Sequence, residues 1–349
     1  MAPKTTEDPT QYKKTERLNE LAFAFKNSAA LLAAIELGVF SAISEGAATA
    51  EAIGAEVGID PEAADRLLIV CKALDLISEK GGRYENRPDV ERYLVKSLPT
   101  YFGDYLVYQA GEGFGGGKSL VEHLTGSNEV EKAKDWNHYK DLMATPESAR
   151  RFTTAGYNAS ISLAHRLAKR FDFSRYKLWL DWAGGSGCYS IAACERHPGL
   201  KTIVMDQPNV IKVTKEFVAK HGLEDRIDIR PGDFLETDYP KGCDLISFIT
   251  PLQGYMPDQV IDILKRTYGA LEPGGTGMVI DYMLNDEKTG PLDPALTNLG
   301  GMRHGKFTGR VNSGAEFKSY FEEAGFVDIE VSWLLEHQLG HVTGKKKAS

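Results

Sequence analysis

The sequence predicts an α/β protein in which a helical domain (residues 1–110) and a helical linker (111–174) precede a doubly wound domain (175–349). Two observations carry this prediction. Apolar residues recur at helical spacing through the first third, and short strand-like runs alternate with helices from about residue 175. Such alternation is typical of a parallel sheet whose ligand binds at the carboxyl ends of its strands. The expected strands are KLWLDWAG, KTIVMDQP, RIDIRPGDF, CDLISFIT, GGTGMVIDYML and, last, VDIEVSWLL.

The bulk composition is typical of a soluble globular protein and argues against several classes of partner. The 349 residues have a formal net charge of −8 and no long basic run, so no nucleic-acid partner is expected. No apolar run approaches the roughly 20 residues that cross a bilayer, and the polar start is unlike a secretory signal. We therefore expect a cytoplasmic protein with no membrane partner. Scattered cysteines predict reduced, mostly buried thiols and no metal, namely at Cys71, Cys188, Cys194 and Cys243.

The first domain is expected to contain helices followed by a small hairpin. Residues 21–44 (LAFAFKNSAALLAAIELGVFSAIS) are apolar nearly all round, which predicts burial, in part against a second subunit. A break at Gly58, a helix start at Asp60–Pro61 and a glycine turn in KGGRYEN (80–86) complete a winged-helix order. Winged helices often bind DNA, but the acidic balance and the lack of a basic recognition helix favour dimerisation. We expect a homodimer.

A glycine-rich turn, DWAGGSG (181–187), follows the first expected strand. Gly184, Gly185 and Gly187 let the backbone turn sharply and come close to a ligand. A dinucleotide fingerprint reads G-x-G-x-x-G and grips a pyrophosphate at a helix N-terminus. Here Asp181 lies in the turn, where it would repel a pyrophosphate but attract a cationic amino acid. S-adenosylmethionine (SAM) carries such an ammonium group.

Acidic residues at the next two strand ends strengthen the prediction of SAM. Asp206, with Gln207 beside it, ends the second expected strand and is placed to accept hydrogen bonds from two ribose hydroxyls. Asp233 and Phe234 end the third, where they offer a carboxylate to the adenine amino group and a ring to its face. Three acidic strand ends in register are far more specific than one glycine turn.

These motifs resemble those of the plant-type O-methyltransferase family, which includes acetylserotonin and hydroxyneurosporene methyltransferases. DWAGGSG corresponds to the family's D-x-G-G-G-x-G, with Ala183 in place of a glycine, and MDQP corresponds to D-L-P. The resemblance implies a Rossmann-like class I methyltransferase domain behind a winged-helix-like dimerisation domain. It also implies a SAM-dependent enzyme with S-adenosylhomocysteine as product, and cofactor contacts from Asp181, Gly184, Gly187, Asp206, Asp233 and Phe234.

The histidine that acts as base in the family's O-methylating members is missing. Those members have L-H-D-W after the strand that follows GDF, and the histidine takes the proton from the substrate hydroxyl. This chain has Gln253, Gly254 and Tyr255 at the positions of histidine, aspartate and tryptophan. Glutamine cannot act as a general base near neutral pH. Either another residue, such as His304 or Tyr255, takes a catalytic role as base, or the nucleophile has no proton to lose.

A thioether sulfur needs no base, because it attacks the methyl group directly and becomes a sulfonium. In lacking the histidine, the chain resembles the methylthiohydroxybutyrate S-methyltransferases of dimethylsulfoniopropionate synthesis. We therefore expect S-methylation of a small thioether hydroxy acid, 4-methylthio-2-hydroxybutyrate. O-methylation of a phenol with a relocated base, or a SAM-binding relative that does not transfer methyl groups, are the alternatives.

A hydroxy-acid substrate would need groups that bind its carboxylate and face its sulfonium product. An arginine fork suits a carboxylate, and a tyrosine ring suits a cation. The candidates are Arg150, Arg151 and Tyr157 before the cofactor domain, Arg303 and Arg310 before the last helix, and Tyr105, Tyr108 and Tyr255.

Overall fold

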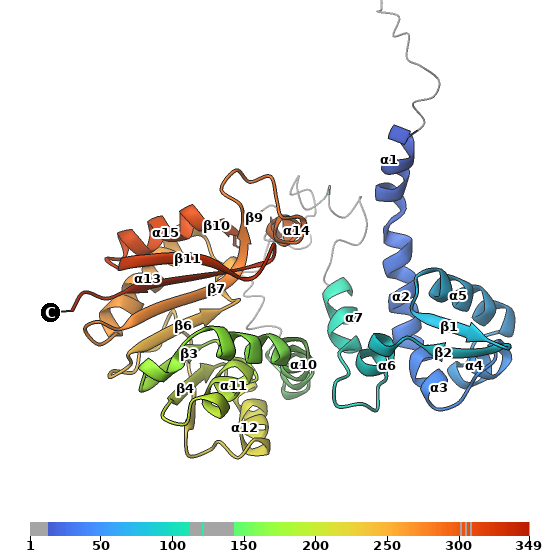
Figure 1. The fold of residues 1–349 in the computed structure, drawn as a ribbon, viewed down its shortest axis with the longest axis horizontal. Coiled ribbons are helices and arrows are strands. Elements are labelled where there is room, and N and C mark those ends of the chain that lie inside the picture. Colours follow the sequence, from blue (N-terminus) through green and yellow to red (C-terminus); the bar gives the residue numbers. More distant parts are fainter. Residues whose placement is uncertain are drawn as a thin grey trace, which may run out of the picture. The chain divides into compact units, whose positions relative to one another are not determined.

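The computed structural model describes residues 13–111, 121, 143–300, 302–303, 306–307 and 309–348. The chain forms two compact units, residues 1–109 and 110–349 (Figure 1). The first unit contains α1 (Lys13–Phe23), α2 (Phe25–Leu37), α3 (Val39–Ser44), α4 (Ala50–Val57), α5 (Pro61–Ala73), β1 (Ile77–Lys80), β2 (Arg83–Asn86), α6 (Pro88–Leu94) and most of α7 (Gly103–Gly111).

The winged-helix order expected for the first unit is confirmed, and its hairpin means that the domain is not purely helical. Strands β1 and β2 pair antiparallel. Gly81 and Gly82 between them have φ of 58° and 78°, as a two-residue turn of type I′ requires. Gly58 ends α4 at φ 74°, and the Asp60 carboxylate accepts a hydrogen bond from the backbone of Glu62 (2.8 Å) at the start of α5.

The apolar segment at residues 21–44 is buried only in its second half. Ala34 and Ile35 lie in the core of the first unit. By contrast Leu18, Leu21, Phe23 and Phe25, on α1 and the start of α2, are 58, 61, 51 and 64% exposed. A run of exposed large apolar side chains marks an interaction surface. The predicted burial therefore needs a partner at the N-terminal end of the segment.

The second unit is a sheet between helices. It contains α10 (Pro146–Arg170), η2 (Phe173–Arg175), β3 (Leu178–Trp182), α11 (Cys188–Arg196), β4 (Lys201–Asp206), α12 (Val210–Lys220), β5 (Ile227–Pro231), β6 (Leu245–Ile249), η3 (Leu252–Gly254), α13 (Pro257–Ala270), β7 (Thr276–Leu284), α14 (Leu292–Gly300), β8 (Met302–Arg303), β9 (Lys306–Phe307), β10 (Asn312–Ser313), α15 (Gly314–Glu323), β11 (Val327–Leu335) and β12 (Leu339–Lys345).

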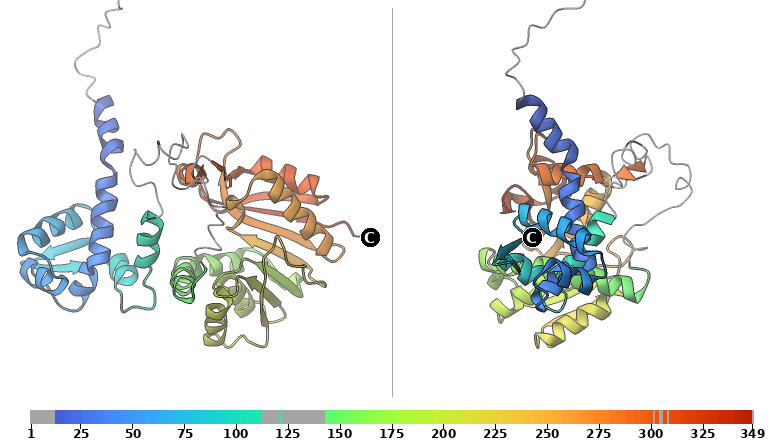
Figure 2. Two further views of the ribbon diagram at one scale, coloured as in Figure 1. Left: turned by 180° about the vertical axis from the view of Figure 1, so that it is seen from behind. Right: turned by 90° about the vertical axis from the view of Figure 1, so that its right-hand side faces the viewer.

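The sheet has the strand order β11-β12-β7-β6-β3-β4-β5, and β3 to β7 are parallel. Successive residues of each strand face opposite cores. Trp179 packs with α10, α11 and α12 on one face, and Leu180 packs with α13 and α15 on the other. The ribbon views show helices on both sides of the sheet (Figure 2). The doubly wound architecture is confirmed. The stretch expected as a linker supplies α10, which packs against α11 and α12 within the second unit.

The segment VDIEVSWLL is not the last strand, because β12 follows β11 and lies between it and β7, antiparallel to both. Two glycines in β12 weaken the residue pattern by which a strand is recognised in a sequence. A Cβ on Gly340 would lie 2.4 Å from the Met283 sulfur, and one on Gly344 would lie 2.7 Å from the Phe321 ring. Close packing at these positions excludes the β-branched residues that identify a strand.

The four cysteines are buried free thiols, as predicted. No helix in the described residues is long and apolar enough to span a membrane. Within the same ranges, no group of three or more His, Cys, Asp or Glu side chains could hold a metal ion.

Candidate cofactor site and acceptor loop

The glycine turn between β3 and α11 lies directly on a buried carboxylate. Asp181 is fully buried and accepts hydrogen bonds from the hydroxyls of Ser190 (2.9 Å) and Ser247 (3.3 Å). A Cβ on Gly184 would lie 3.0 Å from the Asp181 carboxylate and 2.8 Å from a methyl group of Val204. Only glycine therefore fits at 184, and the turn is a cradle of bare backbone.

Three residues of this turn have a left-handed backbone. Gly185 and Gly187 have φ of 56° and 75°, which glycine adopts without strain. Ala183 has φ of 52°, and a residue with a Cβ reaches this region only at a cost. The family motif has glycine at this position, so the substitution leaves local strain in the cradle.

Asp206, at the end of β4, is bonded to the same turn. One of its carboxylate oxygens accepts a hydrogen bond from the Gly185 amide (2.8 Å), and the other accepts one from the Gln207 amide (2.6 Å). A carboxylate has about four acceptor positions, so each oxygen of Asp206 can accept one more hydrogen bond. The sheet register brings these strand ends level, since Trp182 lies opposite Met205 and Asp206 opposite Pro231.

Asp233 and Phe234 begin the turn after β5. An Asp233 carboxylate oxygen accepts a hydrogen bond from the Leu235 amide (2.9 Å), and the Asp233 amide donates to the Thr237 hydroxyl (2.9 Å). The Phe234 side chain is only 8% exposed and packs edge-on against Phe248, with ring centroids 5.5 Å apart. The ring thus belongs largely to the core, and little of it is left to contact adenine.

No cation among the described residues neutralises the Asp181 or Asp206 carboxylate. Burial, with a smaller contribution from the nearby Asp206 carboxylate, raises the pKa of Asp181 to about 7. Burial likewise raises the pKa of Asp206 to about 6, with a smaller contribution from Asp233. Carboxylates in this state favour a ligand that brings a positive charge.

A second loop, after β6, contains Gln253 and is held by a buried carboxylate that the sequence analysis did not identify. Asp281 on β7 accepts hydrogen bonds from the amides of Leu252 (2.8 Å), Gln253 (3.1 Å) and Tyr282 (2.8 Å). It is 2% exposed, and burial raises its pKa to about 7. The signal in the sequence is one carboxylate inside the apolar run GMVIDYML.

The Gln253 loop is strained and tightly packed. Thr250, a β-branched residue, has φ of 67°. A Cβ on Gly309 would lie 2.2 Å from the Gln253 carbonyl oxygen, so the chain leading into β10 packs directly on this loop. In the described part of the chain, the side-chain Oε1 of Gln253 is buried and has no hydrogen-bond partner. Tyr255 connects this loop to the turn after β5, since its ring packs edge-on against that of Phe234 with centroids 5.3 Å apart.

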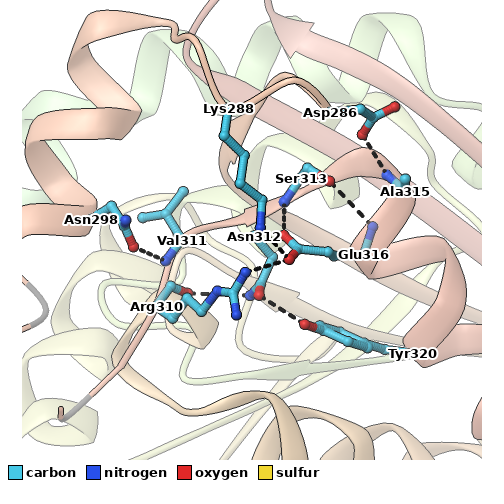
Figure 3. A network of polar contacts seen from close by, with 10 residues as sticks. All are labelled: Asp286, Lys288, Asn298, Arg310, Val311, Asn312, Ser313, Ala315, Glu316 and Tyr320. Carbon is cyan, nitrogen blue, oxygen red and sulfur yellow. Dashed lines mark hydrogen bonds and ion pairs between the residues drawn. The ribbon is translucent and has the colours of Figure 1, made fainter.

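Two of the arginines predicted to bind a substrate carboxylate are already bound to glutamates. Arg150 donates two hydrogen bonds to Glu216 on α12, at 2.8 and 2.5 Å. Arg310 pairs with Glu316 of α15, which also binds Lys288 (2.7 Å) (Figure 3). A substrate role for Arg150 and Arg310 stays a prediction, and in this structure each guanidinium pairs with a carboxylate of the chain itself.

Tyr157 also serves the fold. Its hydroxyl is hydrogen-bonded to the His221 ring (2.8 Å), and its ring stacks on Phe217 with centroids 4.1 Å apart. These contacts hold α10 to α12, so the structure gives no support for a substrate role.

For the remaining candidate residues, a role in substrate binding or catalysis stays a prediction. Arg151 is exposed on α10, and Tyr105 is partly buried on α7 of the first unit. Tyr108 lies on α7 and Arg303 in β8, but the structure describes neither side chain, and His304 lies outside the described residues.

Comparison with known proteins agrees with this arrangement. Residues 120–327 match the model of the O-methyltransferase domain, and residues 19–96 match that of the O-methyltransferase dimerisation domain. The chain is 31% identical over 312 residues to 3-hydroxy-5-methyl-1-naphthoate 3-O-methyltransferase of Streptomyces sahachiroi, covering 89% of each protein. It is 30% identical to the N,N-dimethyltransferase OxyT of Streptomyces rimosus, covering 88% of this chain and 90% of OxyT.

A solved structure gives the same result. Human N-acetylserotonin methyltransferase in complex with SAM superposes with a TM-score of 0.82 at 25% identity, over 100% of both chains. Fold, glycine turn and family models therefore lead to one conclusion. The chain belongs to the SAM-dependent O-methyltransferase family and is a methyltransferase with an N-terminal dimerisation domain.

Proposed function

We propose that this methyltransferase acts on a small molecule whose acceptor atom is a neutral nucleophile, so that no histidine base is needed. The observation that carries the proposal is the Gln253 loop. A glutamine stands where the family's O-methylating members have histidine, and Asp281 and Gly309 hold its backbone from two sides. A carboxamide can accept or donate a hydrogen bond, but it cannot take a proton near neutral pH.

The cofactor site is proposed to lie at the edge formed by β3, β4 and β5. Its residues fit SAM, because Gly184 leaves bare backbone over Asp181, and Asp206 has acceptor positions to spare. In this proposal Asp206, with Gln207, binds the ribose, Asp233 accepts from the adenine amino group, and the turn at Gly184, Gly185 and Gly187 lies against the methionine part. Bound SAM supplies an electrophilic methyl group. The protein's part is to align the acceptor and exclude water.

Two acceptor classes satisfy the requirement for a neutral nucleophile. A thioether sulfur, as in 4-methylthio-2-hydroxybutyrate, has no proton to lose. An amine nitrogen loses its proton only after methyl transfer, and the name of the relative OxyT describes an N,N-dimethyltransferase. Since Glu216 and Glu316 occupy Arg150 and Arg310, a hydroxy acid would depend on Arg151 or Arg303 for its carboxylate. We therefore propose the acceptor atom, sulfur or amine nitrogen, rather than one substrate.

The alternative is O-methylation, the reaction in the name of the Streptomyces sahachiroi relative. It requires a base elsewhere, and Tyr255 and His304 are the candidates. Tyr255 lies two residues from Gln253 and is partly buried beside Phe234. A phenol hydroxyl is a weak base, which makes this the second choice.

The dimerisation domain supports a homodimer. We propose that the exposed apolar side chains of α1 and α2, from Leu18 to Phe25, form part of its interface. Sedimentation of the wild type and of a Leu21→Asp/Phe25→Asp variant tests this, since the variant should sediment as a monomer.

A transfer assay with methyl-labelled SAM tests the acceptor class, with thioether acids, primary and secondary amines, and phenols as acceptors. The proposal expects product from a thioether or an amine. Its kcat/KM should be flat from about pH 6.5 to 9, or should follow the acceptor's own pKa. Gln253→His should fold normally and should not raise that rate. Preferential methylation of a phenol, with kcat/KM following a protein group, would establish O-methylation instead.

A further inference from the structure

One arginine holds the turn that contains Asp233. Arg266, on α13, donates through Nη1 to the carbonyl oxygens of Phe234 (2.7 Å) and Leu235, and through Nη2 to that of Thr237 (2.7 Å). Its guanidinium also lies over the Tyr239 ring, 4.9 Å from the centroid. A single side chain thus binds three carbonyl groups within four residues of backbone.

This turn is irregular, so its shape depends on such contacts. No regular element spans residues 232–244 between β5 and β6. Within the turn, the Asp233 amide donates to the Thr237 hydroxyl (2.9 Å), and the Thr237 amide donates to the Asp233 carbonyl (2.7 Å). The Tyr239 hydroxyl donates to the Phe234 carbonyl (3.1 Å). The arginine adds charge-assisted hydrogen bonds, which are stronger than those between neutral groups.

The support behind Arg266 is rigid. Val260, Ile263 and Leu264 of α13 are buried in the core that packs against the sheet. The hydrogen bonds of Arg266 therefore fix the turn relative to a helix that is packed against the sheet. Its planar fork is what allows three carbonyls to be bound at once, and a lysine ammonium has no equivalent geometry.

We propose that Arg266 is a positioning residue for the cofactor, which fixes the turn so that the Asp233 carboxylate meets the adenine amino group. The inference rests on the proposed cofactor site. It assigns Arg266 no contact with the cofactor, and it makes adenine recognition depend on a residue 33 positions after Asp233 in the chain.

Binding of S-adenosylhomocysteine, measured by calorimetry, tests this without an acceptor. Arg266→Lys keeps the charge but loses the fork, and it should raise the Kd at least about tenfold. The matched control is Arg230→Lys on β5, where the arginine pairs with Asp228 on the surface (2.7 Å), and its Kd should change by less than about twofold. Thermal unfolding of both variants without ligand shows any general loss of stability.

The analogue S-inosylhomocysteine, which lacks the amino group, separates positioning from general stability. Arg266→Lys should weaken the analogue's binding much less than that of S-adenosylhomocysteine, and its effect should be less than additive with Asp233→Asn. If Arg266→Lys does not fold, Thr237→Val tests the same turn from the other side and should weaken S-adenosylhomocysteine about threefold or more.

A lowered melting temperature with an unchanged Kd would overturn the positioning role and leave the cofactor site intact. Equal losses for both ligands would overturn it as well. If the wild type binds both ligands equally and Asp233→Asn changes neither Kd, then the proposed adenine contact of Asp233 itself is wrong.

Discussion

The proposed cofactor edge, formed by β3, β4 and β5, and the Gln253 loop are both organised by aspartates, but in different ways. At the cofactor edge Asp206 accepts hydrogen bonds from two amides and has acceptor positions left for a ligand. By contrast Asp281, at the Gln253 loop, is only 2% exposed and accepts hydrogen bonds from three backbone amides, and the nearby Gln253 Oε1 is buried without a partner in the described residues. In the proposed function, the Asp206 carboxylate thus binds the cofactor directly, and the Asp281 carboxylate only shapes a loop.

The comparison is tested most strongly by Asp281→Ala. The variant leaves one buried and two partly buried amides without this acceptor, so the free energy of unfolding should fall by about 3 kcal/mol, and methyl transfer should be lost. Affinity for S-adenosylhomocysteine should change by less than about threefold, because the cofactor edge does not use this carboxylate. Denaturant unfolding and calorimetry measure the two effects. A comparable loss of cofactor affinity would show that the two regions are not independent.

Asp206→Ala should weaken cofactor binding more than it lowers stability, the reverse of Asp281→Ala. Charge-assisted hydrogen bonds contribute about 1.5–3 kcal/mol each, so SAM should bind about 10- to 100-fold more weakly, with a smaller loss of stability. Asp228→Ala, which removes an exposed carboxylate from the neighbouring strand β5, is the control. Calorimetric Kd values that match for the two variants would mean that the ribose lies elsewhere.

Cofactor binding should also depend on pH. The folded pKa values of Asp181 and Asp206, about 7 and about 6, lie above the usual value near 4, so the folded chain holds extra protons between about pH 4 and 7. These groups therefore make the ligand-free protein less stable as pH rises through that window. A cationic ligand favours the ionised carboxylates, so SAM affinity should rise about tenfold from pH 5 to 7. Affinity that stays constant over this range would contradict the charge argument.

The smallest expected effect comes from Ala183→Gly. Glycine adopts φ of 52° without the steric cost that alanine bears, although the unfolded chain gains some freedom. The free energy of unfolding should rise by roughly 0.5 kcal/mol, and SAM affinity should stay unchanged or improve slightly. A destabilised variant would show that the Ala183 methyl group contributes packing that outweighs its strain.

The sequence predicted the arrangement of the strand ends well, because each signal is local to one strand end. Gly184 and Asp206 each stand at the end of a recognisable strand, and parallel strands bring such ends together. The roles of Asp281 and Arg150 could not be found in this way. Asp281 acts on amides of a loop about 30 residues earlier, and Arg150 binds Glu216, which is 66 residues later. Partners at such separations follow from packing, which no short pattern encodes.

Elements of the fold were predicted where apolar residues recur at regular spacing. They were missed where close packing requires residues that break this spacing. The helix start at Asp60–Pro61 and the strands β3 to β7 follow the expected patterns. Strand β12 does not, because Gly340 and Gly344 meet Met283 and Phe321 too closely for any side chain. Burial of α1 could not be judged from one chain, since its exposed apolar side chains form part of the proposed dimer interface.

The position of β12 has a consequence for synthesis of the chain. Strand β11 is made first, yet it reaches the sheet only through β12, which pairs with β7 on its other side. Until residues 339–345 have left the ribosome, this edge of β7 lacks its native partner, and open edges recruit strands from other chains. Chains that still lack this segment should therefore aggregate more readily than complete ones.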